Sequence, residues 1–219
     1  MTTLSPPGKG NRLFCGSMGY LLLATNNQAK VREYRSLLEN IPFELVTLAE
    51  RGITTVVEET GDSLEENARL KAVLLAGESQ LLSLADDSGL EVDALGGEPG
   101  RLSARYAGEG ASDRDRISYL LKRLEKVPWD IRSARFRCVI ALAMPGGEVN
   151  LCSGECRGFI TFEPKGGGGF GYDPVFYLPE LGKTMAELSL EEKNRVSHRG
   201  QAARKARQLL EKMALNLPA

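Results

Sequence analysis

Two adjacent carboxylates follow an apolar run in the segment Leu81-Leu82-Ser83-Leu84-Ala85-Asp86-Asp87-Ser88-Gly89-Leu90. The apolar half predicts a buried β-strand that ends at the two aspartates. Because neighbouring side chains of a strand point to opposite faces, at most one carboxylate faces a given site, and the other belongs to a turn, a cap or the surroundings of that site. Open α/β proteins place ligand and metal chemistry at the carboxyl ends of strands. The alternative is a plain Asp-Ser-Gly turn.

The composition limits the classes of protein that this chain can belong to. Its 219 residues are 42% hydrophobic and 26% charged, with a formal net charge of -1. This charge predicts no nucleic-acid partner, and no apolar run approaches the roughly 18 residues of a membrane span. We therefore predict a cytoplasmic protein.

The four cysteines do not predict a metal site. They form no CxxC pair, and His198 is the only histidine that could join them. Zinc needs more ligands at closer spacing. We expect Cys138 and Cys152 to be small buried thiols, and a cytosolic setting disfavours a structural disulfide.

The first residues differ from the rest of the chain. Residues 1–18 contain prolines and glycines without periodicity, which predicts a disordered leader. Met18 is then the natural start, or residues 1–17 are a dispensable tail. Residues 19–219 are expected to form a single domain.

Alternating strand and helix patterns predict a mixed α/β fold with one antiparallel hairpin. Strands are expected at residues 20–24, 43–48, 81–85, 90–95, 135–144 and 148–162. Helices are expected at 30–40, 63–77, 112–126 and 197–215, with a further short helix that begins at Ser189. Capping boxes are predicted for Ser63 with Glu66 and for Ser189 with Glu192, and Ser112 is predicted to cap a helix that has Asp115 near its start.

Three segments break local rules and are therefore candidates for function. Residues 25–30 join a strand to a helix N-terminus, where backbone N–H groups bind anions; the alternative is an Asn-capped helix. Residues 166–174 combine a glycine-rich loop with Phe170 and Tyr172, which could stack on a base; the alternative is a flexible loop with both aromatics in the core.

The third segment covers residues 197–201. Its cations oppose the helix dipole, and Arg199 suits a phosphate or a purine edge; the alternative is an exposed charged helix start. Lys193 lies nearby in the sequence. Together, acidic groups for a metal, lysines for phosphates, and aromatics with Arg199 for a base predict a nucleotide site with Mg²⁺.

The ordered set of motifs resembles the inosine triphosphate pyrophosphatase family across residues 20–202. The motifs are Ala24-Thr25-Asn26-Asn27 with Lys30, Glu58-Glu59-Thr60-Gly61, Glu66-Asn67-Ala68 with Lys71, Ala85-Asp86-Asp87-Ser88-Gly89-Leu90, Pro99-Gly100 with Ser103-Ala104-Arg105-Tyr106, Gly168-Gly169-Phe170-Gly171-Tyr172-Asp173-Pro174 and Ser197-His198-Arg199-Gly200-Gln201. The resemblance implies an α/β fold with a long twisted mixed sheet flanked by helices, and two lobes around a central active-site cleft.

The resemblance also implies an activity, Mg²⁺-dependent hydrolysis of ITP, dITP and XTP to the monophosphate and pyrophosphate by a homodimer. It assigns Asp87 as the catalytic carboxylate and metal ligand, and Glu59 as a second acidic residue near the metal. The substrate contacts that it implies are Thr25, Asn26, Asn27, Gln28, Ala29, Lys30, Lys71, Ser88, Phe170, Gly171, Tyr172, Asp173, Lys193, His198 and Arg199.

Base selectivity is expected to depend on the purine 6-position, because hypoxanthine and xanthine carry an oxygen acceptor there and adenine an amino donor. Donors such as Arg199 would leave adenine with opposed donors, and an unpaired buried donor costs about 1–3 kcal/mol. Guanine must be excluded at its 2-position. Two alternatives remain, a pyrophosphatase for pyrimidine triphosphates and a non-catalytic nucleotide-binding protein.

Overall fold

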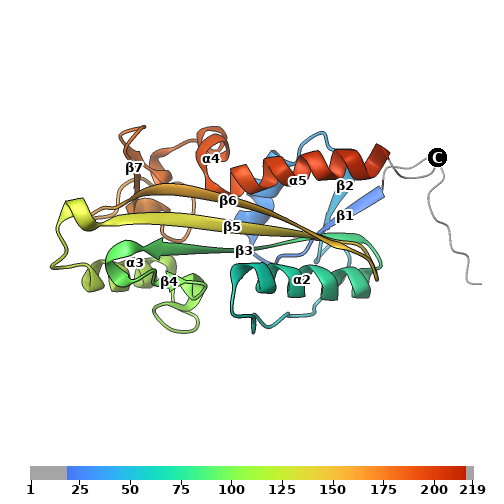
Figure 1. Cartoon of the computed structure of the whole chain (residues 1–219), viewed down its shortest axis with the longest axis horizontal. Helices are drawn as coiled ribbons and strands as arrows, with labels where there is room; N and C mark the ends of the chain where they lie inside the picture. The colour runs from blue at the N-terminus through green and yellow to red at the C-terminus, as the bar shows by residue number, and fades with distance from the viewer. Residues whose placement is uncertain (1–18, 216–219) are drawn as a thin grey trace, which may run out of the picture.

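A long mixed β-sheet runs through the computed structural model, which describes residues 19–215 (Figure 1). Within these residues the sheet has eight strands in the order β2-β1-β3-β5-β6-β7-β8, with β4 paired to β3. The predicted mixed α/β fold, a long sheet flanked by helices, is confirmed. The leader predicted over residues 1–18 lies outside the described residues, and its boundary stays a prediction. No helix within residues 19–215 is both long and apolar enough to cross a membrane.

The first part of the chain builds the parallel part of the sheet. Its elements are β1 (Gly19–Leu23), α1 (Gln28–Leu37), β2 (Phe43–Thr47), α2 (Leu64–Ser79) and β3 (Leu82–Val92). Strand β1 pairs in parallel with both β2 and β3. Parallel strands need crossover connections, and α1 and α2 occupy them.

The second part of the chain extends the sheet with antiparallel strands. Its strands are β4 (Pro99–Gly100), β5 (Ser133–Ala143), β6 (Val149–Ile160), β7 (Phe176–Leu178) and β8 (Lys183–Thr184), and its helices are α3 (Asp113–Arg123), α4 (Leu190–Val196) and α5 (His198–Leu215). The predicted hairpin is the β5–β6 pair. The long strands β3, β5 and β6 carry β1, β2, α1 and α2 at one end, and α3, β4 and β7 at the other (Figure 1).

Strand β3 corrects the prediction of two short strands separated by a turn at the aspartates. It is one continuous strand of 11 residues, in which Asp86 pairs with Ile140 and Asp87 with Val139 of β5. The ladder with β5 overrides the turn preference of Asp-Ser-Gly, because strand propensity depends on tertiary context. The parallel pairing with β1 ends at Leu84, so the aspartates still lie just beyond the carboxyl end of β1.

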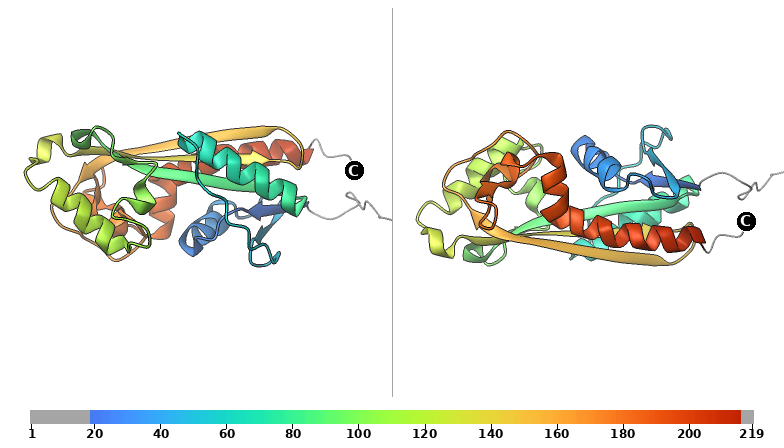
Figure 2. Two further views of the ribbon diagram at one scale, coloured as in Figure 1. Left: turned by 90° about the horizontal axis from the view of Figure 1, so that it is seen from below. Right: turned by 90° about the horizontal axis from the view of Figure 1, so that it is seen from above.

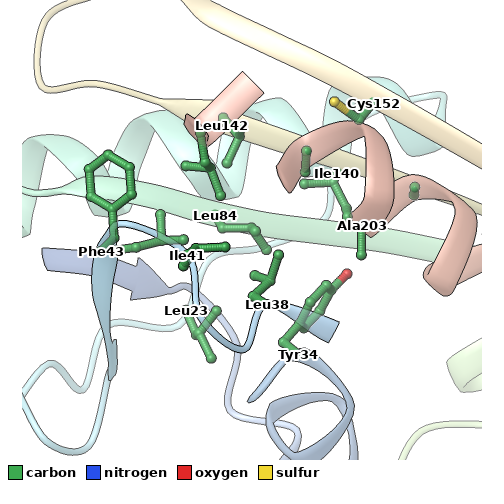
Figure 3. Packing of buried hydrophobic residues seen from close by; sticks show 14 of the residues in the cluster. Leu23, Tyr34, Leu38, Ile41, Phe43, Leu84, Ile140, Leu142, Cys152 and Ala203 are labelled. Carbon is green, nitrogen blue, oxygen red and sulfur yellow. The ribbon is translucent and has the colours of Figure 1, made fainter. Parts of the chain in front are cut away.

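Alternate residues of the strands point into cores on opposite faces of the sheet. One core packs Leu84 and Ile140 against α1 and α5 (Figure 3), and another packs Ala85 and Val139 against α2. Figure 2 shows α2 and α5 covering opposite faces of the long strands. The same alternation places Asp86 on the α1/α5 face and Asp87 on the α2 face.

Gly154 of β6 determines how closely α5 approaches the sheet. A Cβ at this position would clash with the His198 carbonyl oxygen and lie 2.7 Å from the Ala202 amide nitrogen. The first turn of α5, which carries His198 and Arg199, therefore rests directly on a glycine.

We expect Gly154→Ala to lower the free energy of unfolding by about 1–3 kcal/mol, because the backbone of α5 must shift. Urea unfolding measures the change. Gly77→Ala is the matched control: Gly77 is an exposed α2 residue with open space around its Cα, and the same substitution there should stabilise by about 0.5–1 kcal/mol. Equal changes in the free energy of unfolding at the two positions would show that the close approach of α5 to Gly154 does not limit the residue at this position.

Candidate active site

A cleft of about 540 Å³ opens beyond the carboxyl end of β1. Sixteen of the predicted site residues line it: Thr25, Asn26, Asn27, Ala29, Lys30, Glu59, Lys71, Asp87, Ser88, Phe170, Gly171, Tyr172, Asp173, Lys193, His198 and Arg199. Gln28 is exposed and is not among the residues of the cleft wall. The cleft thus brings together site residues from Thr25 to Arg199, which lie far apart in the sequence. Open α/β folds allow this.

The start of α1 forms one wall of the cleft. The Asn27 side-chain oxygen accepts hydrogen bonds from the amides of Ala29 at 2.9 Å and Lys30 at 3.2 Å. The Asn27 amide in turn donates to the Thr25 hydroxyl at 3.2 Å. The local geometry is therefore the Asn-capped helix, and the expectation that these two amides are free to bind an anion is wrong.

Asp86 lies behind the cleft and binds two cations. Its carboxylate is 3.0 Å from the Lys30 ammonium and 3.3 Å from the Arg199 guanidinium, and only 2% of the residue is exposed. Burial alone would raise the pKa of Asp86, but Lys30 and Arg199 hold that pKa well below its usual range. Asp86 is thus a charged anchor for two residues of the cleft wall.

Asp87 faces the cleft from the opposite side of β3. It accepts hydrogen bonds from the Asn67 amide group at 3.1 Å and from the Ser88 backbone amide at 3.0 Å. Burial, together with the nearby charge of Glu59, raises the pKa of Asp87 against the opposing effect of Lys71. Two hydrogen bonds therefore fix the Asp87 carboxylate in place, and its pKa is raised.

Lys71 of α2 lies between the two predicted metal ligands. Its ammonium is 2.8 Å from a carboxylate oxygen of Glu59 and 3.5 Å from one of Asp87. Burial would lower the pKa of Lys71, but Asp87, Asp86 and Glu59 raise it above its usual value. Glu59 and Asp87 thus converge on one cation.

Glu33 is a site residue that the sequence analysis missed. It is buried on α1 and accepts hydrogen bonds from the Lys193 ammonium at 2.7 Å and the Arg199 guanidinium at 2.8 Å. Although burial opposes ionisation, Arg199 and Lys193 lower the pKa of Glu33. The spacing of Glu33 from Lys30, three positions along one helix face, was the available sequence signal.

The glycine-rich loop leads into an aromatic wall. Phe170 is half-buried, and its ring faces the Lys193 ammonium at 4.8 Å and the Arg199 guanidinium at 5.3 Å. Asp173 fixes this arrangement, because it accepts from the Phe170 amide at 2.8 Å and from Lys193 at 2.5 Å. Tyr172 is buried and donates its hydroxyl hydrogen to the Ser103 carbonyl at 2.9 Å, so Phe170 is the aromatic available for stacking.

His198 lines the cleft beside Arg199 and has one ring nitrogen without a hydrogen-bond partner in the described part of the chain. Its ring stacks on Phe136 with 4.6 Å between centroids and 12° between planes. Nδ1 is buried and has no hydrogen-bond partner among the residues that the structure describes. Burial, with the positive charges of Arg199 and Lys193, lowers the pKa of His198 well below 6.5. The imidazole is therefore neutral at pH 7.

Within residues 19–215, no group of three or more histidine, cysteine, aspartate or glutamate residues is placed to hold a metal ion. The described cysteines, Cys138, Cys152 and Cys156, are free and buried, which confirms the prediction of buried thiols at the first two. Any metal at Glu59 and Asp87 must therefore take further ligands from water or from a bound molecule.

We expect Asp86→Asn to lower the free energy of unfolding at pH 7 by about 3–5 kcal/mol, because it leaves Lys30 and Arg199 without their shared buried partner. The folded-state pKa of Asp86 lies below the unfolded value of about 3.9, so its stabilisation is complete above that pH and is lost as pH falls through the folded pKa. Urea unfolding between pH 7 and pH 3 should show the advantage of the wild type shrinking only below about pH 4. The matched change at exposed Asp130 should have little effect, and a similar loss there would contradict the assignment.

Comparison with known proteins identifies the family of this chain. A model of the Ham1 family matches residues 21–209. A dITP/XTP pyrophosphatase of Desulforamulus reducens is 50% identical over 196 residues, which are 90% of this chain and 98% of that protein. A dITP/XTP pyrophosphatase of Bacillus subtilis is 46% identical over 190 residues, which are 87% of this chain and 96% of that protein.

Solved structures agree with these sequence matches. The structure of a HAM1 protein from Coxiella burnetii superposes with a TM-score of 0.81 at 42% identity, covering 89% of this chain and all of the other. The Staphylococcus aureus Ham1 protein gives a TM-score of 0.79 at 42% identity, covering 89% of this chain and 99% of the other. These matches confirm the resemblance found in the sequence motifs, and the chain belongs to the Ham1 family.

Proposed function

We propose that this chain hydrolyses dITP, XTP and ITP to the corresponding monophosphate and pyrophosphate, with Mg²⁺ as cofactor. It is an enzyme of the nucleoside triphosphate pyrophosphatase class, as its relatives named dITP/XTP pyrophosphatase indicate. The observation that carries the proposal is one cleft in which Glu59 and Asp87 converge on a cation, opposite a wall formed by Phe170, His198 and Arg199.

The oxygen ligands that Glu59 and Asp87 offer fit Mg²⁺. Glu59 and Asp87 offer carboxylate oxygens, and both already contact the ammonium of Lys71. Mg²⁺ is commonly held by one or two carboxylates together with waters and substrate phosphates. When bound there, Mg²⁺ would lower the pKa of a coordinated water and neutralise charge on the phosphate oxygens.

The protein's own residues supply the remaining chemistry at the phosphates. Asp87, with its raised pKa, can bind the metal or accept the proton of the attacking water, and a base is most effective when its pKa approaches the working pH. Lys30 and Lys71 line the cleft and would offset the charge that develops on the leaving pyrophosphate.

The aromatic wall accounts for the choice of base. We infer that the purine stacks on Phe170 and that the neutral His198, which lines the cleft, meets its edge. A neutral imidazole can donate to the 6-oxygen of hypoxanthine or xanthine, whereas the amino group of adenine would face a donor. Arg199 also borders this space, but its guanidinium is already bound to Glu33, Asp86 and Ser88, so its main role there is to position other groups.

The proposal also includes a homodimer in the cytoplasm without a nucleic-acid partner. The formal net charge of -1 supports the absence of a nucleic-acid partner. Light scattering coupled to size-exclusion chromatography tests the dimer.

We expect Mg²⁺-dependent pyrophosphate release from dITP, XTP and ITP at kcat/KM values at least about 100-fold above those for dATP and GTP. EDTA should abolish the release. The measurement is a pyrophosphate assay over these nucleotides and UTP. Preferential release from UTP would instead support a pyrimidine triphosphatase, and no release from any nucleotide would support a binding protein.

We expect His198→Phe to lower kcat/KM for dITP and XTP by at least about tenfold, because one hydrogen bond to a buried acceptor is lost. The kcat/KM for dATP should change little. Phenylalanine keeps the stacking on Phe136 but lacks the nitrogen. Asp87→Asn is the contrasting variant, since it should reduce turnover of every substrate by a similar factor. Equal losses for dITP and dATP in His198→Phe would remove His198 from base recognition.

A further inference from the structure

Lys71 occupies the position in which two carboxylates would hold a metal ion. Its ammonium lies 2.8 Å from Glu59 and 3.5 Å from Asp87, and its side chain is only 13% exposed. A divalent cation and an ammonium cannot share this position, because two positive charges a few ångströms apart repel each other strongly in a partly buried site. Metal binding at these carboxylates therefore requires the Lys71 ammonium to leave.

The two carboxylates keep other supports when Lys71 moves. Asp87 is held by hydrogen bonds from Asn67 and from the Ser88 amide. The segment that carries Glu59 is held by Asn67, which accepts from the Gly61 amide at 2.8 Å, and by Arg105, whose guanidinium is 3.4 Å from the Glu59 carbonyl oxygen. The site is thus built to persist without the ammonium.

Lys71 itself is able to move. Its flexible four-carbon stem and freely rotating ammonium give it several positions, and it lines the same cleft as Lys30. A triphosphate in this cleft would offer oxygens to the displaced ammonium, so the charge that leaves the carboxylates is compensated by the substrate.

We propose that Lys71 is a positioning residue that holds the metal position in the substrate-free enzyme, so that a divalent metal binds tightly only together with a triphosphate. This inference rests on the proposed metal site at Glu59 and Asp87. It goes beyond a phosphate contact, because it assigns to Lys71 a competition with the metal that operates before substrate arrives.

The experiment titrates the nucleotide-free protein with Mn²⁺ and follows free Mn²⁺ by electron paramagnetic resonance. We expect Lys71→Met to bind Mn²⁺ at least about tenfold more tightly than the wild type, because the competing charge is removed. Lys71→Arg, which keeps a cation, should bind as weakly as the wild type. Arg101→Gln is the matched control, since Arg101 lines the cleft without an ion pair to either carboxylate in the described part of the chain, and its affinity should be unchanged.

The outcomes separate this inference from the proposed metal site. Equal Mn²⁺ affinity in Lys71→Met and the wild type would overturn the inference and leave the metal site intact. Adding Asp87→Asn to Lys71→Met should abolish the gain, and a gain that persists would place the metal elsewhere and overturn both. If Lys71→Met unfolds without metal, circular dichroism provides the readout: folding restored by Mn²⁺ supports the inference, and failure to restore it overturns it.

Discussion

The buried carboxylate of Asp86 is the constraint on which the site depends. Leaving such a charge unpaired inside a protein costs several kcal/mol, so it must be matched by cations held at short range. Lys30 from α1 and Arg199 from α5 meet this need. Two helices from opposite ends of the chain are thereby brought to one strand, and both Lys30 and Arg199 line the cleft.

The register of β3 divides the chemistry between two faces of the sheet. Because side chains alternate along a strand, Asp86 points toward α1 and α5, and Asp87 points toward α2. Asp86 binds Lys30 and Arg199, while Asp87 and Glu59 share Lys71. Two adjacent aspartates therefore serve different purposes without competing for the same partners.

Sequence patterns were sufficient where the physical cause is local. The capping box at Ser189 and the β5–β6 hairpin formed as predicted, because their partners lie within a few residues or across one turn. The capping box predicted at Ser63 is wrong in one half: the Ser63 side chain caps the Glu66 amide, but the Glu66 carboxylate accepts from the Asp62 amide instead of the Ser63 amide. The continuous β3 strand was missed, since its partner β5 lies about fifty residues away and its pairing outweighs the local turn preference. Glu33 was missed for the same reason: its partners Lys193 and Arg199 are reached only through the fold.

Charge pairing also explains how one cleft can treat base and phosphates differently. Around the aromatic wall, the cations Lys193 and Arg199 are matched by the carboxylates Glu33, Asp173 and Asp86. A wall whose charges are internally paired attracts no particular charge, so the purine that we propose to bind there would be recognised by stacking and by single hydrogen bonds. On the other side, Glu59 and Asp87 share the Lys71 ammonium, and the Arg105 guanidinium lies 3.9 Å from the Glu59 carboxylate. Carboxylate oxygens are ligands that Mg²⁺ accepts. In the complex that we propose, a divalent metal would neutralise the charge of a triphosphate that these carboxylates would otherwise repel.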